Sequence, residues 1–158
     1  MSFDDFQSMK ALRAWPILLL RVYTGIFFAY YGFGKIVGGN FADGMTGFLS
    51  SKSEDMFGWY RVIVEAVIVP QQGLFAFLVA YGELALGIAL IIGLATRYAA
   101  FAGAFMVLNF WLAKGQGVLD AQNHDVVWFV LLIVLGGLHA GRVLSVDQKL
   151  VKRFRFLA

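Results

Sequence analysis

The sequence contains no cysteine, only two prolines and two histidines, and few charged residues. Without cysteine, the chain cannot form a disulfide, bind a metal through thiolates or perform thiol redox chemistry by itself. Charged residues make up 15% of the 158 residues, whereas soluble domains average about 25%. The shortage of charge argues against an ordinary soluble domain.

Apolar residues are correspondingly abundant. They make up 60% of the chain and gather in four long blocks separated by short polar stretches. A soluble domain of this length leaves roughly a third of its chain surface exposed, so much of this apolar surface would face water. Because lipid is the more suitable surrounding, we predict one all-α domain, residues 1–158, that forms a four-helix transmembrane bundle.

The four blocks predict helices at 14–35, 73–94, 98–113 and 125–144, followed by a basic cytoplasmic tail at 145–158. Pro16 suits the first turn of the first helix, where its missing N–H has no partner to lose. Gly38, Gly39 and Asn40 should end that helix. Between the first two blocks, apolar residues recur at helical spacing among polar ones, which predicts short amphipathic helices in the first outer loop.

Small residues recur every four positions on the predicted helices. Examples are Gly25 and Ala29 on the first helix, and Ala85, Ala89 and Gly93 on the second. Such spacing lets helix backbones approach closely in a membrane, where no hydrophobic effect drives helices together. The stripes could form a homodimer seam or pack within one bundle, and four helices in one chain favour packing within the bundle.

Two charged residues, Arg21 and Glu83, lie well inside apolar blocks. A charge in mid-membrane costs at least ~2.5–3.5 kcal/mol, so each side chain should face the bundle interior and have a partner. Arg21 and Glu83 have opposite signs and similar estimated depths, roughly 10 Å or more from the inner helix ends. We therefore expect them to pair directly or through one bridging group, either to hold the helices in register or to serve a ligand.

Other polar side chains suggest an outward-facing pocket near the start of the fourth helix. The candidates are His124, Asp125, Lys35, Glu65, Asn109 and Lys114. A metal site needs three or four converging ligands, and only His124 and Asp125 are close in sequence. Asp125 is also explained as an acidic residue in the first turn of a helix, where it interacts favourably with the helix dipole. His139 has no histidine partner on another helix for a haem. We expect neither metal nor haem.

Several of these residues form a pattern along the chain. The run Leu19-Leu20-Arg21-Val22 is followed by Gly25, Phe28, Gly32 and Lys35, and later by Glu83, Gly87, Gly93-Leu94, Thr96-Arg97 and Ala99-Ala100. In order and spacing this pattern resembles the DoxX family over most of residues 19–106. The family is associated with membrane subunits of quinone-linked oxidoreductases, including archaeal thiosulfate:quinone oxidoreductase.

The resemblance implies a subunit of such an enzyme in a prokaryotic plasma membrane, working with lipids and with other subunits of a complex. It points to Arg21, Lys35, Glu83 and Arg97 as cofactor-binding positions, to Arg21 and Glu83 as the catalytic pair, and to quinone as the cofactor. The alternative is a structural or assembly subunit without enzymatic activity. The basic tail fits a cytoplasmic membrane flank better than a nucleic-acid site, so no nucleic-acid partner is expected.

The distribution of Lys and Arg predicts that both termini lie in the cytoplasm, since the inner side then carries about twice as many as the outer side. Cysteines introduced singly at Ser2, Ser53 and Ser145 test this topology in a chain without cysteine of its own. A membrane-impermeant thiol reagent applied to intact cells should label only the variant at Ser53. Labelling at Ser2 or Ser145 would overturn the topology.

Overall fold

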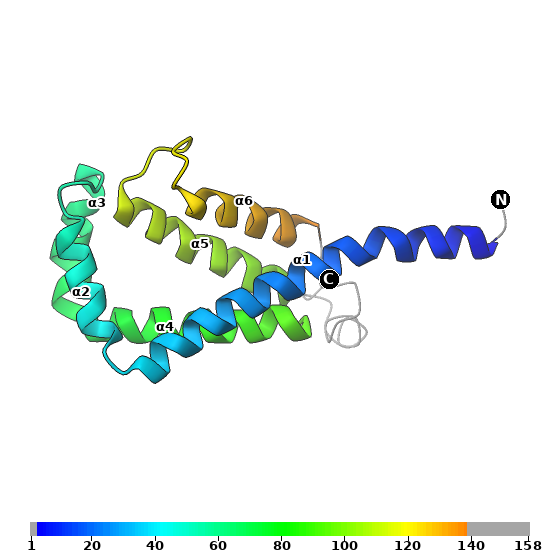
Figure 1. The fold of residues 1–158 in the computed structure, drawn as a ribbon, viewed down its shortest axis with the longest axis horizontal. Helices are drawn as coiled ribbons and strands as arrows, with labels where there is room; N and C mark the ends of the chain where they lie inside the picture. The colour runs from blue at the N-terminus through cyan, green and yellow to red at the C-terminus, as the bar shows by residue number, and fades with distance from the viewer. Residues whose placement is uncertain (1–2, 139–158) are drawn as a thin grey trace.

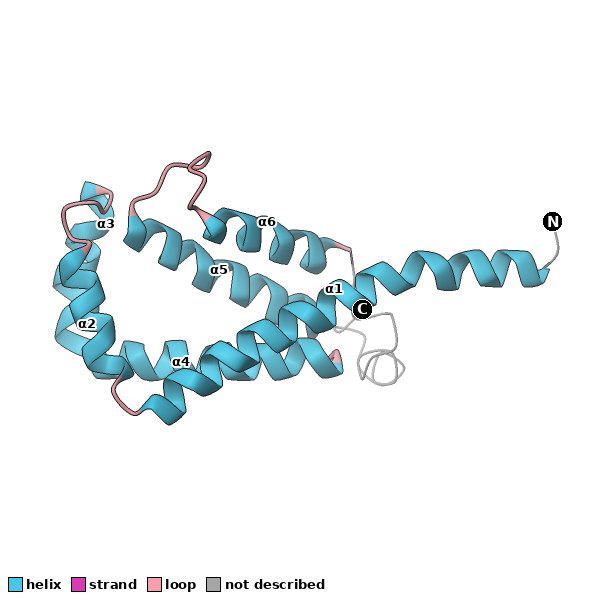
Figure 2. Cartoon of the chain, viewed as in Figure 1, coloured by secondary structure: helices cyan, strands magenta, loops and turns pink. Residues whose placement is uncertain are grey.

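The computed structural model describes residues 3–138, with side chains described from Trp15 onward, and these residues form helices and no strand (Figures 1 and 2). The elements are α1 (Phe3–Gly38), α2 (Phe41–Ser51), α3 (Gly58–Ile63), a π-helical turn (Val64–Ile68), a 3-10 turn (Val69–Gln71), α4 (Gln72–Ile92), α5 (Thr96–Lys114) and α6 (His124–Gly137). The expectation of an all-α chain is confirmed for this part of the sequence.

Four long helices stand where four were predicted, and they pack as two antiparallel pairs, α1 with α4 and α5 with α6 (Figure 1). The short connection Gly93–Ala95 reverses the chain between α4 and α5, with Gly93 and Ala95 both in the left-handed region. The pairs join through a core to which all four helices contribute, including Phe28, Leu90 and Leu132. Residues 139–144 of the predicted fourth helix, His139 and the tail lie outside the described residues.

Two helical stretches are long and apolar enough to cross a membrane, Trp15–Gly38 and Gly58–Ile92. The helix His124–Gly137 is apolar but shorter within the described residues. The polar side chains of Arg97 and Asn109 lie within α5 and lower its mean hydropathy. The described chain is thus an all-helical protein with two candidate membrane spans.

Helix α1 is longer than predicted, because it begins at Phe3 and runs through Pro16 to Gly38. The prediction that Pro16 occupies the first turn was wrong. An interior proline removes one backbone hydrogen bond and crowds the carbonyl four residues earlier, but the helix continues on both sides of Pro16. The N-terminal part of α1 projects away from the other helices (Figure 1). The glycine-rich end was predicted correctly, and Gly39 has a positive φ of 72°.

The predicted amphipathic segment forms α2 and α3, which lie together at one end of the long helices (Figure 1). The helical path does not stop after α3 but continues through the π-helical and 3-10 turns into α4. Pro70 lies in the 3-10 turn, and its missing N–H and its ring disturb regular α-helical hydrogen bonding at this point. The segment therefore bends around the end of the bundle before α4 begins.

A seam of small residues joins α1 to α4. A Cβ atom added to Gly87 would lie 2.3 Å from the backbone nitrogen of Ala29, and one added to Gly32 would lie 2.5 Å from that of Leu84. The preferred interpretation of the small-residue stripe, packing within the chain, is thus confirmed for Gly25 and Ala29. Of the stripe predicted on the second helix, Gly93 is buried and Ala89 is partly buried, whereas Ala85 is exposed. The small residue of α4 that meets the α1 backbone is Gly87.

This seam predicts a large difference between two glycine substitutions within α4. Gly87→Ala should lower the free energy of unfolding by about 1–3 kcal/mol or more, because the new methyl group meets backbone that cannot move cheaply. Gly73→Ala is the matched control, since no atom lies within 4 Å of its added Cβ, and alanine is the better helix former. Thermal unfolding in detergent compares the two, and equal stabilities would contradict the close contact.

Candidate functional site

Glu83 of α4 is paired with Lys35 of α1. The Lys35 ammonium group donates hydrogen bonds to both carboxylate oxygens of Glu83, each at 2.5 Å. The Glu83 side chain is only 4% exposed and that of Lys35 is 23% exposed. Side chains lean toward the N-terminus of their own helix, so in an antiparallel pair these two residues lean toward one another. The ion pair satisfies a buried carboxylate inside the helix contact.

The predicted pair between Arg21 and Glu83 is wrong. Gly25 lies against the backbone of Gly87 and Ile91, so Arg21, one turn earlier, lies level with 91–95. That position is about 12–18 Å from Glu83 along the helix axes at 1.5 Å per residue. The two side chains also lean away from each other, because their helices run in opposite directions. The depth estimate failed because it did not include the observed register of the two helices.

The four predicted cofactor-binding residues therefore divide between two ends of the bundle. Lys35 and Glu83 are together near the end closed by α2 and α3. Arg21, which is 1% exposed, lies toward the other end. Arg97 is exposed at the start of α5, where its guanidinium carbon lies 5.9 Å from the centre of the Phe101 ring. The structure brings together only Lys35 and Glu83 from the predicted set.

A cavity of about 700 Å³ opens beside Lys35, and we call it the large cavity. Its walls come from the end of α1, from α2, α3 and the π-helical turn, and from α4 and α5. Most of the lining is apolar, including Phe41, Met45, Phe48, Leu49, Ile68, Phe75, Leu78, Val79, Phe105, Met106 and Phe110. Binding sites for small molecules commonly have ~300–1,000 Å³ and apolar walls with a few placed polar groups.

The polar groups of the large cavity are Lys35, Tyr60, Asn109 and Lys114. The Tyr60 hydroxyl donates to the Asn109 side-chain oxygen at 3.0 Å, and the Asn109 amide donates to the Phe105 carbonyl at 2.7 Å. These bonds fix the Asn109 amide and tie α3 to α5.

Lys114 is held by Asp125 of α6 at 2.7 Å. Of the residues predicted to share a pocket, Lys35, Asn109 and Lys114 line one cavity. Glu65 instead is exposed near Arg61, and His124 is exposed. Within residues 3–138 no three His, Asp or Glu side chains converge as metal ligands would, and the expectation that the chain binds no metal remains a prediction.

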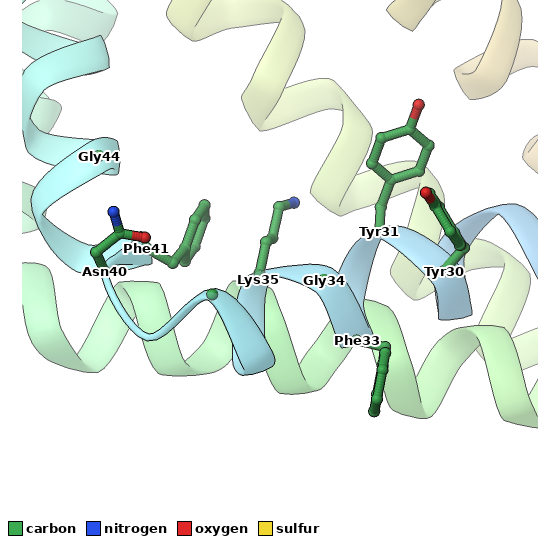
Figure 3. Close-up of a pocket in the computed structure, with 9 residues that line it drawn as sticks. Tyr30, Tyr31, Phe33, Gly34, Lys35, Asn40, Phe41 and Gly44 are labelled. Atoms are coloured by element: carbon green, nitrogen blue, oxygen red, sulfur yellow. The ribbon is translucent and has the colours of Figure 1, made fainter.

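A second cavity, of about 430 Å³, lies between the end of α1 and the start of α2, and we call it the small cavity (Figure 3). Lys35, Phe41 and Gly44 line both cavities. The Lys35 ammonium lies 5.1 Å from the centre of the Phe41 ring and 5.4 Å from that of Phe110. Figure 3 shows Lys35 and Tyr31 projecting to the same side of α1, with Phe33 on the opposite side.

An ammonium group has three N–H donors, and two of those on Lys35 bond Glu83. One donor remains for an oxygen atom of a ligand in the large cavity. Tyr60, Phe41 and Phe110 also belong to the site but were not identified from the sequence as partners of Lys35. Phe41 and Tyr60 lie in the segment predicted to form amphipathic helices, but the residues opposite them are set by helix packing.

The observed ion pair predicts a specific coupling of free energies. Lys35→Met and Glu83→Gln should each lower stability, by about 3–5 kcal/mol where a buried partner is stranded, and the double variant should lose less than the sum. Arg21→Met combined with Glu83→Gln is the control, and those losses should add. Unfolding in detergent measures both cycles, and additivity of the Lys35 and Glu83 changes would contradict the pairing.

Comparison with known proteins agrees with the pattern of residues along α1, α4 and α5. The DoxX family profile matches residues 17–115, which is more than half of the chain and includes both Lys35 and Glu83. No curated protein and no solved structure matches the chain. With its candidate site inside the matched segment, the chain belongs to the DoxX family.

Proposed function

We propose that this chain is a membrane subunit of a quinone-linked oxidoreductase and that a quinone head group binds in the large cavity against Lys35. The observation that carries the proposal is an apolar cavity of about 700 Å³ with one buried ion pair, Lys35 with Glu83, at its wall. A quinone ring needs apolar walls and a few hydrogen-bond donors for its carbonyl oxygens. Membership of the DoxX family supports the same function.

Each residue of the site has a definite part in this proposal. Lys35 donates its remaining N–H to a carbonyl oxygen of the head group, while Glu83 fixes the direction of the ammonium group. Asn109 lines the same cavity, and in this proposal the second N–H of its amide donates to the other carbonyl. A bound quinone accepts two electrons and two protons. A partner subunit supplies the electrons, because this chain has no cysteine for redox chemistry.

The proposal includes a topology. The helices α1, α4, α5 and α6 span a prokaryotic plasma membrane, and both termini lie in the cytoplasm. The two apolar stretches Trp15–Gly38 and Gly58–Ile92 support a membrane-spanning arrangement. The excess of Lys and Arg on the inner side supports cytoplasmic termini. The end with α2 and α3, and with it the large cavity, then lies toward the outer surface.

The assignment of cofactor binding to Arg21 and Arg97 changes under this proposal. Lys35 and Glu83 bind the head group, whereas Arg21 and Arg97 lie toward the opposite end of α1 and α4. The exposed Arg97 is available at the surface for another subunit. Neither arginine then acts on the bound quinone.

A structural or assembly subunit is the second candidate function. The tight α1–α4 seam favours it, because a scaffold needs rigid helices and a fixed register. In that case the ion pair between Lys35 and Glu83 serves helix packing alone, and other subunits carry the quinone site.

The double variant Lys35→Met with Glu83→Gln separates the two functions, because it removes both charges and strands neither. We expect quinone reduction by the assembled complex to fall by roughly tenfold or more, while assembly is retained. The exposed pair of Lys52 and Asp55 provides the matched control. The double variant Lys52→Met with Asp55→Asn should leave quinone reduction and assembly of the complex unchanged.

Equilibrium binding of decyl-ubiquinone to the isolated subunit in detergent tests the site without the partner. The double variant should bind more weakly than the wild type. Unchanged binding and unchanged electron transfer in a complex that still assembles would eliminate the quinone role and leave the scaffold function.

A further inference from the structure

The large and small cavities adjoin, and they share Lys35, the residue proposed to bind the quinone head group. Lys35, Phe41 and Gly44 line both. A ligand bound at Lys35 in the large cavity therefore lies next to the small cavity, between α1 and α2. Together the two spaces form a bent site with its polar anchor at the junction.

The outer rim of the small cavity is exposed and aromatic. Tyr30 is 74% exposed and Phe33 is 58% exposed, on the side of α1 that faces away from the core. In a membrane-spanning α1 these rings contact lipid. The small cavity thus has Lys35 and these lipid-facing rings in one lining.

Two glycines of the small cavity have open space where a side chain would project. Gly34 and Gly44 line the small cavity, and an added Cβ at either position would have no atom within 4 Å. Unlike Gly25, Gly32 and Gly87, these glycines do not serve helix packing. Their effect is to leave space between α1 and α2 where side chains would otherwise project.

From this geometry we propose that the two cavities are one binding site for a chain-bearing ligand, with the head group at Lys35 and the apolar tail leaving through the small cavity between α1 and α2. The inference rests on the proposed quinone function, and it assigns the path of the tail. A quinone carries a long apolar tail that remains in the bilayer, so a site for its head group needs a lateral opening to lipid.

The rival opening lies between α4 and α5, where the large cavity is lined by the exposed side chains Leu78 and Phe105. Two differences favour the opening between α1 and α2. Gly34, Gly38 and Gly44 stand among the aromatic residues of the small cavity, whereas the residues of α4 and α5 that line the large cavity include no glycine. The polar anchor Lys35 is also a wall of the small cavity.

The test compares two probes, decyl-ubiquinone and the tail-less ubiquinone head group, by equilibrium binding to the purified full chain in detergent. Gly34→Leu places a side chain in the small cavity alone, and Gly44→Leu places one at the junction. Gly47→Leu is the matched control on α2, because Gly47 lines neither cavity and also has free space around it. Ala102→Leu narrows the rival opening, since Ala102 is exposed and lines the large cavity.

We expect Gly34→Leu to raise the Kd of decyl-ubiquinone by roughly tenfold, the equivalent of about two methylene groups left unburied, and to leave the Kd of the head group unchanged. Gly44→Leu should also weaken the tailed probe more than the tail-less one. Gly47→Leu should affect neither probe, and Ala102→Leu should not weaken the tailed probe more than the tail-less one. Retained binding of the head group shows in each case that the variant is folded.

The outcomes distinguish this inference from the function on which it rests. If the wild type binds the head group but Gly34→Leu leaves the tailed probe unaffected, the tail path is wrong and the quinone site stands. If Ala102→Leu selectively weakens the tailed probe, the tail leaves between α4 and α5. If the wild type binds neither probe, both proposals fail.

Discussion

A carboxylate buried between two helices is the constraint on which the rest of this structure depends. Glu83 lies inside the contact of α4 with α1, where a charge requires an opposite charge nearby. Lys35 supplies it because the two helices are antiparallel and each side chain leans toward the other. The pair therefore exists only in this orientation and near this register of α1 along α4.

The seam of small residues specifies the same register independently. Gly25 and Gly32 of α1 lie where a side chain would collide with the backbone of α4. Sliding α1 by one turn would bring larger residues to these contacts, and it would also separate the Lys35 ammonium from Glu83. Because charge pairing and backbone packing agree, the contact can hold two charged groups in fixed positions, which is what a binding site requires.

Three polar contacts between helices lie at the end that α2 and α3 close. Lys35 with Glu83, Tyr60 with Asn109, and Lys114 with Asp125 each join different helices there. The helices also share an apolar core that includes Phe28, Leu90 and Leu135. The large cavity lies among the polar contacts, so a ligand there meets apolar walls and a few oriented donors. Structural and ligand-binding roles of Glu83 are compatible, because the ion pair that holds the helices also directs the ammonium group.

Much of the local structure could be predicted from the sequence. Within the described residues the apolar blocks located the long helices to within a few residues, except at the start of α1, and the glycines marked the end of α1. A lone carboxylate in an apolar block showed that Glu83 must be buried and paired. These features depend on composition and on spacing within one segment, which a sequence displays directly.

The partner of Glu83 and the shape of the cavity were decided only by the tertiary structure. Arg21 and Lys35 are both cations of one helix, and the choice between them depends on how far α1 is shifted along α4. That shift is set by the contact of Gly25, Gly32 and Gly87 with the opposing backbone. The large cavity likewise depends on α2 and α3 folding back beside α4 and α5. Spacing along a chain gives the face and direction of a side chain on its own helix, but the residues opposite it are determined by where two helix surfaces fit.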